Sequence, residues 1–177
     1  MANVKVVTIF WTGSSNVPYA SELNTFYGAV TNSPWMQILS EYSTPTTNIG
    51  MGSLVASCSY DTAPTYATMW DVGIQYRLTT LIQSGQVPPP DGNTYYAIHF
   101  PSSVVIKFGS GDASCSSFCA YHGSFYMGSS WVAYDVMPTC LGRCGKDPVL
   151  LNNLYSVASH ELAEAVTNPT GSWTNVR

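Results

Sequence analysis

Hydrophobic and polar positions follow two different patterns along the chain. Runs rich in β-branched and aromatic residues predict buried strands, and segments with apolar residues three or four positions apart predict amphipathic helices. The predicted strands span 4–11, 51–60, 95–100, 104–108 and 131–137. The predicted helices span 18–30, 34–42, 71–84 and 149–167. Because strands alternate with helices, we expect an α/β (α+β) fold in which helices flank a mixed central β-sheet.

Proline and glycine residues set the bounds of the predicted helices. Pro18 suits a first helical turn, Gly85 suits the position after a helix end, and Pro169 follows the last helix. The apolar face of helix 18–30 comprises Leu23, Phe26, Tyr27 and Val30. The helical spacing in 71–84 runs through Val72, Tyr76, Thr79 and Ile82. The break at 88–92 is too short for an interdomain linker, so we expect one domain over 1–177.

Composition and charge exclude several classes of function. Hydrophobic residues make up 45% of the 177 residues, enough for one core, whereas charged residues make up only 9%. The net charge of −4 with six Lys and Arg leaves no basic patch, which argues against nucleic-acid binding. No apolar run is long enough to span a membrane, and the N-terminus has no signal-peptide pattern. The polar but uncharged composition favours a secreted, extracellular protein.

The five cysteines fall into two pairs and a single residue. Cys115 and Cys119 form one C-x3-C pair, Cys140 and Cys144 form the other, and Cys58 stands alone. Two disulfides within the pairs, each stiffening a short loop, fit an oxidising compartment best. A zinc site of all four thiolates is the less favoured alternative, since zinc ribbons usually carry C-x2-C. We expect Cys58 to be a free thiol.

The last predicted helix carries the pattern with chemical content, Ser-His-Glu-Leu-Ala-Glu-Ala-Val-Thr-Asn-Pro from Ser159 to Pro169. His160 and Glu164 are four positions apart, so they project from one helix face and can ligate one Zn²⁺ ion. Glu161 holds the position of the general base in H-E-x-x-H metalloproteases, where it takes a proton from the zinc-bound water. The alternative is a hydrogen-bonded His–Glu pair with a purely structural role.

A third zinc ligand must come from elsewhere in the chain. The candidates are His122, His99, Asp112 and Asp135, and His122 is favoured because a disulfide would fix its loop. Alternation places His99 on the same strand face as Tyr95 and Ala97, which favours a core residue with satisfied hydrogen bonds, or a surface residue, over a ligand. That none of the four is a ligand remains an equal alternative.

Several segments together carry a resemblance to a known family. They are the Val-Val-Thr-Ile-Phe-Trp-Thr-Gly opening, the 74–84 helix, Cys-Ser-Ser-Phe-Cys-Ala-Tyr-His-Gly-Ser from Cys115, Thr-Cys-Leu-Gly-Arg-Cys from Thr139, and the final helix with Ala-Val-Thr-Asn-Pro. With these segments the chain resembles the phosphate-induced (EXORDIUM-like) proteins of plants and their fungal and bacterial relatives.

The resemblance implies two different functions. Plant members look like secreted, cell-wall-associated proteins without an established enzymatic activity, and they lack the His–Glu pair. Microbial members keep S-H-E-L-x-E-A-x-T-[DN]-P, which looks like an active metal site. This chain has Asn168 where many of them have Asp. Relatives also run beyond the Gly171–Trp173 region, so the resemblance leaves two alternatives: a third ligand or a substrate-binding strand is missing here, or a removed tail supplies it.

Two hypotheses of function follow, and a third reading leaves the metal purely structural. The first is a secreted zinc-dependent hydrolase acting on peptides or proteins, with His160, Glu164 and His122 as ligands and Glu161 as the base. The hydroxyl groups of Tyr121, Tyr126 and Tyr155 would stabilise the oxyanion that forms during hydrolysis. The second is a non-catalytic extracellular protein that binds a receptor or cell-wall carbohydrate, for which the aromatic residues would serve as stacking surfaces. The oligomeric state is left open.

Overall fold

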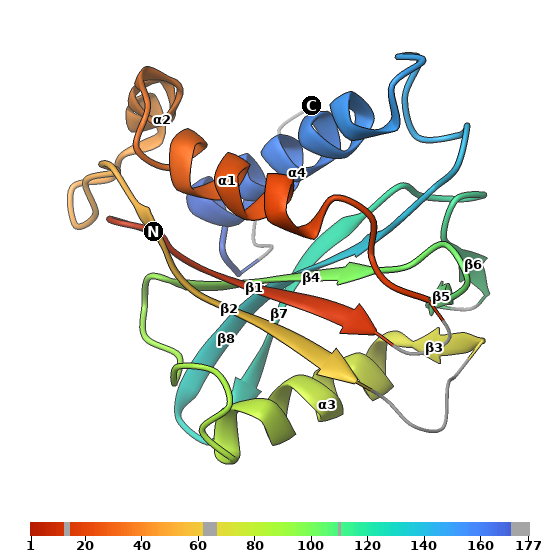
Figure 1. Cartoon of the computed structure of the whole chain (residues 1–177). Helices are drawn as coiled ribbons and strands as arrows, with labels where there is room; N and C mark the ends of the chain where they lie inside the picture. The colour runs from red at the N-terminus through yellow and green to blue at the C-terminus, as the bar shows by residue number, and fades with distance from the viewer. Residues whose placement is uncertain (13–14, 62–66, 110, 171–177) are drawn as a thin grey trace.

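Five strands form the central sheet of the computed structural model, in the order β2-β1-β4-β8-β7 (Figure 1). The structure describes residues 1–12, 15–61, 67–109 and 111–170. The strands are β1 (Lys5–Thr12), β2 (Ser53–Asp61), β4 (Thr94–Phe100), β8 (Ser130–Pro138) and β7 (Tyr121–Met127). The first four run parallel, and β7 pairs antiparallel with β8 at one edge. The predicted mixed sheet is therefore confirmed.

Helices cover both faces of this sheet (Figure 1). On one face lie α1 (Ala20–Val30), α2 (Pro34–Ile38), the 3-10 helix η1 (Leu39–Tyr42) and α4 (Leu150–Thr167), while α3 (Asp71–Gln83) covers the other. A small second sheet comprises β3 (Thr68–Trp70), β5 (Val105–Phe108) and β6 (Asp112–Ala113). Of these three strands the sequence predicted only β5, because two or three residues carry too little periodicity.

The central strand β4 divides the core between the two faces. All seven of its residues are buried, as expected for a parallel strand covered on both sides. Tyr95 and Ala97 pack with α1 and α4, whereas Tyr96 and Ile98 pack with α3. The face predicted for α1 is confirmed, since Leu23 and Tyr27 are fully buried.

Of the four residues that carry the helical spacing predicted for α3, only Ile82 is buried. Val72 and Tyr76 are 73% and 69% exposed, and the buried residues are Ile74, Leu78, Leu81 and Ile82. Both sets have helical spacing, so periodicity alone does not decide between them. The Ile and Leu side chains pack against the sheet, whereas Val72 and Tyr76 lie on the solvent side. Gly85 ends the helix as predicted, with a positive φ of 73°.

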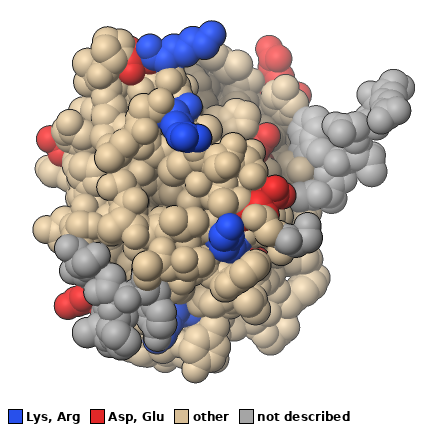
Figure 2. Space-filling model, turned by 90° about the vertical axis from the view of Figure 1, so that its right-hand side faces the viewer, with Lys and Arg blue, Asp and Glu red and all other residues tan. Residues whose placement is uncertain are grey.

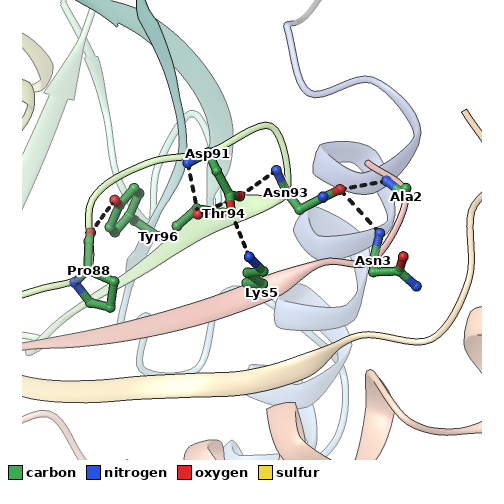
Figure 3. A network of polar contacts seen from close by, with 8 residues as sticks. All are labelled: Ala2, Asn3, Lys5, Pro88, Asp91, Asn93, Thr94 and Tyr96. Carbon is green, nitrogen blue, oxygen red and sulfur yellow. Dashed lines mark hydrogen bonds and ion pairs between the residues drawn. The ribbon is translucent and has the colours of Figure 1, made fainter.

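The segment before β4 is held to the N-terminus by polar contacts (Figure 3). Asn93 Oδ1 accepts hydrogen bonds from the backbone N–H groups of Ala2 and Asn3. Lys5 Nζ lies 2.6 Å from Asp91 Oδ2, and this hydrogen bond is the main cause that lowers the pKa of Asp91. The predicted break at 88–92 is thus an ordered turn that aligns β1 with β4.

The disulfide pairing expected from the cysteine spacing is wrong. The bonds are Cys115–Cys140 and Cys119–Cys144, each joining residues 25 positions apart, and neither is formed within a C-x3-C pair. The reason is the antiparallel pairing of β7 with β8, which places the segment before β7 beside the segment after β8. All four thiols are consumed, so the four-thiolate zinc site is excluded, and Cys58 is free as predicted.

Charged side chains are sparse on the surface, and Figure 2 shows one face on which uncharged residues predominate. Within the described part of the chain, no helix combines the length and the apolar character needed to cross a bilayer. The two disulfides are compatible with an extracellular location.

Candidate metal centre

The packing of α4 on the sheet fixes where its polar residues point. Leu154, Ala158, Leu162 and Ala165 are buried against the sheet, which confirms that small and aliphatic residues form the packed side of the helix. Glu161 lies on this buried side and is 4% exposed. His160, one position earlier, has a side chain that is 66% exposed.

The edge strand β7 supplies His122. Its neighbours Tyr121 and Phe125 pack with the core on the α3 side, and alternation along the strand turns His122 to the α4 side. The Cys119–Cys144 bond fixes the chain three residues before His122. The structure therefore brings His122 to the helix that carries the His–Glu pattern, as the sequence predicted.

The side chains of His122, Glu161, Glu164 and His160 form one cluster, which we call the α4–β7 cluster. His122 Nδ1 lies 2.9 Å from Glu164 Oε2 and 3.6 Å from Glu161 Oε2. His160 Nε2 lies 3.4 Å from Glu164 Oε1. One ligand atom each from His122, Glu161 and Glu164 lies within 4.8 Å of the others, close enough for one ion after small side-chain rotations.

Two buried atoms of the cluster have no hydrogen-bond partner in the described structure, namely His122 Nε2 and Glu161 Oε2. A buried carboxylate oxygen without a partner is costly, and the second carboxylate at Glu164 adds like charge nearby. The interaction with Glu161, with a further contribution from Glu164, raises the pKa of His122. Two carboxylates therefore share a single imidazole, that of His122, as their neighbour of opposite charge.

A buried acid lies behind the cluster. Asp135 is the cross-strand partner of His122, and its carboxylate accepts hydrogen bonds from Tyr95 Oη at 2.5 Å and from the Ile98 N–H. Burial, reinforced by the charge of Glu161, raises the pKa of Asp135 to about 8. Its two oxygens are thus already occupied, and Asp135 is not among the residues grouped around the ion position.

The other predicted candidates lie outside the cluster. Asp112 is exposed on β6. His99 is buried as predicted, but its Nε2 atom has no partner, so the expectation of a satisfied core residue is wrong in that respect. Asn168 caps the end of α4 and lines a cavity beside Glu164. Gly171–Trp173 and Arg177 lie outside the described residues.

The tyrosines expected to steady an oxyanion are committed elsewhere. Tyr121 Oη donates to Asp71 Oδ1 at 2.6 Å on the α3 side of the sheet. Tyr155 stacks on Phe26, and Tyr126 stacks on Trp131. Sequence reasoning also missed Leu39 and Tyr42, which line the cavity beside the cluster. No sequence pattern links these two residues to α4, and their position beside the cluster follows only from the contact between η1 and α4.

The donor set of the cluster fits zinc. Imidazole nitrogen and carboxylate oxygen bind zinc at about 2.1 Å, and catalytic zinc sites often combine two His with one Glu. An ion would give the His122 Nε2 atom a ligand contact and would place a positive charge beside the buried Glu161 carboxylate. The cluster can therefore hold a divalent cation and keep a carboxylate beside it.

Comparison with protein-family models, with curated proteins and with solved structures gives no match for this chain.

Proposed function

We propose that this protein is a zinc-dependent hydrolase with its metal centre at the α4–β7 cluster. His122 and Glu164 would hold the ion together with His160, which lies 3.4 Å from Glu164. The observation that carries the proposal is the buried, partnerless Oε2 of Glu161, 3.6 Å from a histidine in a group that converges on one point. A carboxylate kept in such a place without a cation would only destabilise the fold.

Each residue of the cluster would have a distinct task. Zinc supplies Lewis acidity and lowers the pKa of water in such sites. Glu161, whose buried Oε2 atom has no hydrogen-bond partner, would accept the proton released by water. Glu164 would hold the ion beside His160, whose Nε2 atom lies 3.4 Å from Glu164 Oε1.

Peptides or proteins are the proposed substrates, and the proposed location is outside the cell. The H-E-x-x-E pattern on α4 supports peptide hydrolysis, because its spacing matches the zinc-binding helix of metalloproteases. The two disulfides and the low charge support secretion. The resemblance to EXORDIUM-like proteins supports the same location, and membership of their microbial branch is part of the proposal.

Zinc stoichiometry and peptide cleavage, measured on the same variants, test this function. The wild-type protein should bind one zinc ion per chain after chelation and reloading. His160→Ala should bind zinc at least about tenfold more weakly. Glu161→Gln should keep its zinc but lose peptide cleavage. Glu22→Gln, an exposed helix residue outside the cluster, is the matched control and should behave as wild type. Absence of zinc from the wild type would overturn the proposal. If Glu161→Gln loses zinc while His160→Ala keeps it, Glu161 is a ligand and not the base.

A further inference from the structure

Two hollows open on either side of the α4–β7 cluster. The first, about 370 Å³ in volume, borders His122 and Glu164 and is lined otherwise by Leu39, Tyr42, Ala163, Thr167 and Asn168. We call it the neutral hollow. The second, about 330 Å³, borders His160 and Glu161 and is lined otherwise by Cys119, Ala120, Ser156 and Val157. The cluster thus lies between two cavities. A peptide longer than one residue could occupy both cavities and would then pass over the cluster.

The walls of the neutral hollow indicate what it can accept. Apart from the cluster's own His122 and Glu164, its lining carries no acidic or basic side chain. A Lys or Arg side chain would find no counter-ion there beyond Glu164, and an acidic side chain would face the Glu164 carboxylate. Leu39 and the half-exposed ring of Tyr42 offer apolar contact, and the volume lies at the lower end of the range for small-ligand pockets.

The edge strand provides a track for an extended chain beside both hollows. In the described sheet β7 pairs only with β8, so its outer edge carries unpaired backbone groups. Ala120 and His122 are two positions apart along this segment, and they border different hollows. A peptide added along a strand edge presents alternate side chains to one face, and that face of this segment borders both hollows.

We propose that the neutral hollow is the subsite for a bulky uncharged side chain next to the bond that is cut, so that the substrates are peptides with an aliphatic or aromatic residue at that position. This inference rests on the proposed hydrolase function and adds a specificity to it. Tyr42 and Leu39 are then specificity-determining residues, although neither belongs to the cluster.

Binding of hydroxamates to the zinc-loaded protein, measured by calorimetry, tests this inference without relying on turnover. Acetohydroxamate has no side chain and probes the metal alone. N-acetylated leucine and phenylalanine hydroxamates should bind at least about tenfold more tightly than acetohydroxamate, because burial of such side chains is worth that much. The aspartate and lysine analogues should gain less than about threefold.

Two variants complete the test. Tyr42→Ala should reduce the gain of the phenylalanine analogue by about threefold or more, without altering the zinc content or the binding of acetohydroxamate. Tyr76→Ala, an exposed tyrosine on α3 across the sheet, is the matched control and should leave every value unchanged. Equal gains for charged and uncharged side chains, or a Tyr42→Ala variant that behaves as wild type, would overturn the specificity alone. A wild type that fails to bind acetohydroxamate would instead refute the zinc site.

Discussion

The Nδ1 atom of His122 lies 2.9 Å from the Oε2 atom of Glu164, and this contact joins the edge strand of the sheet to the last helix. Strand β7 and helix α4 each need the other to complete the cluster, because neither carries a full donor set. The centre therefore depends on how the edge strand is held as well as on the pattern within α4.

The first prediction concerns the contribution of the strand. His122→Ala should weaken zinc binding on the order of 100-fold, because it removes the ligand that lies against both carboxylates. His99→Phe is the matched control, since it removes a buried histidine outside the cluster and should leave zinc affinity unchanged. Competition with a chelating dye measures both affinities. Equal zinc binding by His122→Ala and wild type would show that the ion is held by α4 alone.

The second prediction concerns the two disulfides, which run in parallel between the same two segments. Closing one loop of 25 residues stabilises a chain by about 3.5 kcal/mol in the entropic model, but a second bond beside it adds less. Replacing Cys115 and Cys140 by Ala should therefore cost less than about 3.5 kcal/mol, and the four-fold Ala variant should cost more than twice as much. Urea denaturation provides the comparison, with Cys58→Ala as the control for loss of a free thiol. A four-fold variant that loses no more than twice the stability lost by the double variant would contradict the overlap of the two closed loops.

The error over these cysteines shows what a sequence pattern leaves out. Strand and helix positions follow from local periodicity, and the bounds of β1, β4, α1 and α4 agree with the predictions to within about two residues. The pairing of Cys115 with Cys140 depends instead on which strands lie side by side, which no local spacing encodes. The same limit applies to the partner of Tyr121, since its hydrogen bond to Asp71 joins a strand to a helix 50 positions away in the sequence.

The part of the candidate site that lies on α4 could be predicted from local sequence, because helix geometry alone relates its residues. The four-residue spacing of His160 and Glu164 places both on one helix face whatever the tertiary structure. The sequence favours His122 because a disulfide would fix its loop, and Cys119 three residues before it is bonded to Cys144. The neutral hollow could not be predicted, because Leu39 reaches α4 through a long-range contact between two helices.

The third prediction tests the corrected face of α3. Ile74 is fully buried and Val72 is 73% exposed, although only one residue separates them in the sequence. Ile74→Ala should lower the free energy of unfolding by about 2 to 5 kcal/mol, whereas Val72→Ala should change it by less than about 0.5 kcal/mol. Chemical denaturation of both variants beside wild type gives the two values. A larger loss at Val72 would restore the face that the periodicity first indicated.

The fourth prediction follows from the environment of His99. Its ring stacks on Phe10 and meets Tyr27 edge to face, with centroid distances of 5.2 and 5.8 Å, and its Nε2 atom has no partner. Burial lowers its pKa from 6.5 to about 3, because an imidazolium would have to leave water without a counter-ion. The folded protein therefore keeps His99 neutral in a pH range where the unfolded chain binds a proton.

The sign of the pH dependence follows from this difference in bound protons. Between pH 6.5 and about 3 the unfolded state binds more protons at this position, so the stability present above pH 6.5 is lost as the pH falls. His99 alone should cost the wild type about 2 kcal/mol between pH 6.5 and about 4.5. His99→Phe keeps the aromatic contacts and cannot titrate, so urea denaturation should show a shallower loss of stability over the same interval. Parallel losses in the two proteins would mean that His99 has a protonated partner or access to water in the folded state.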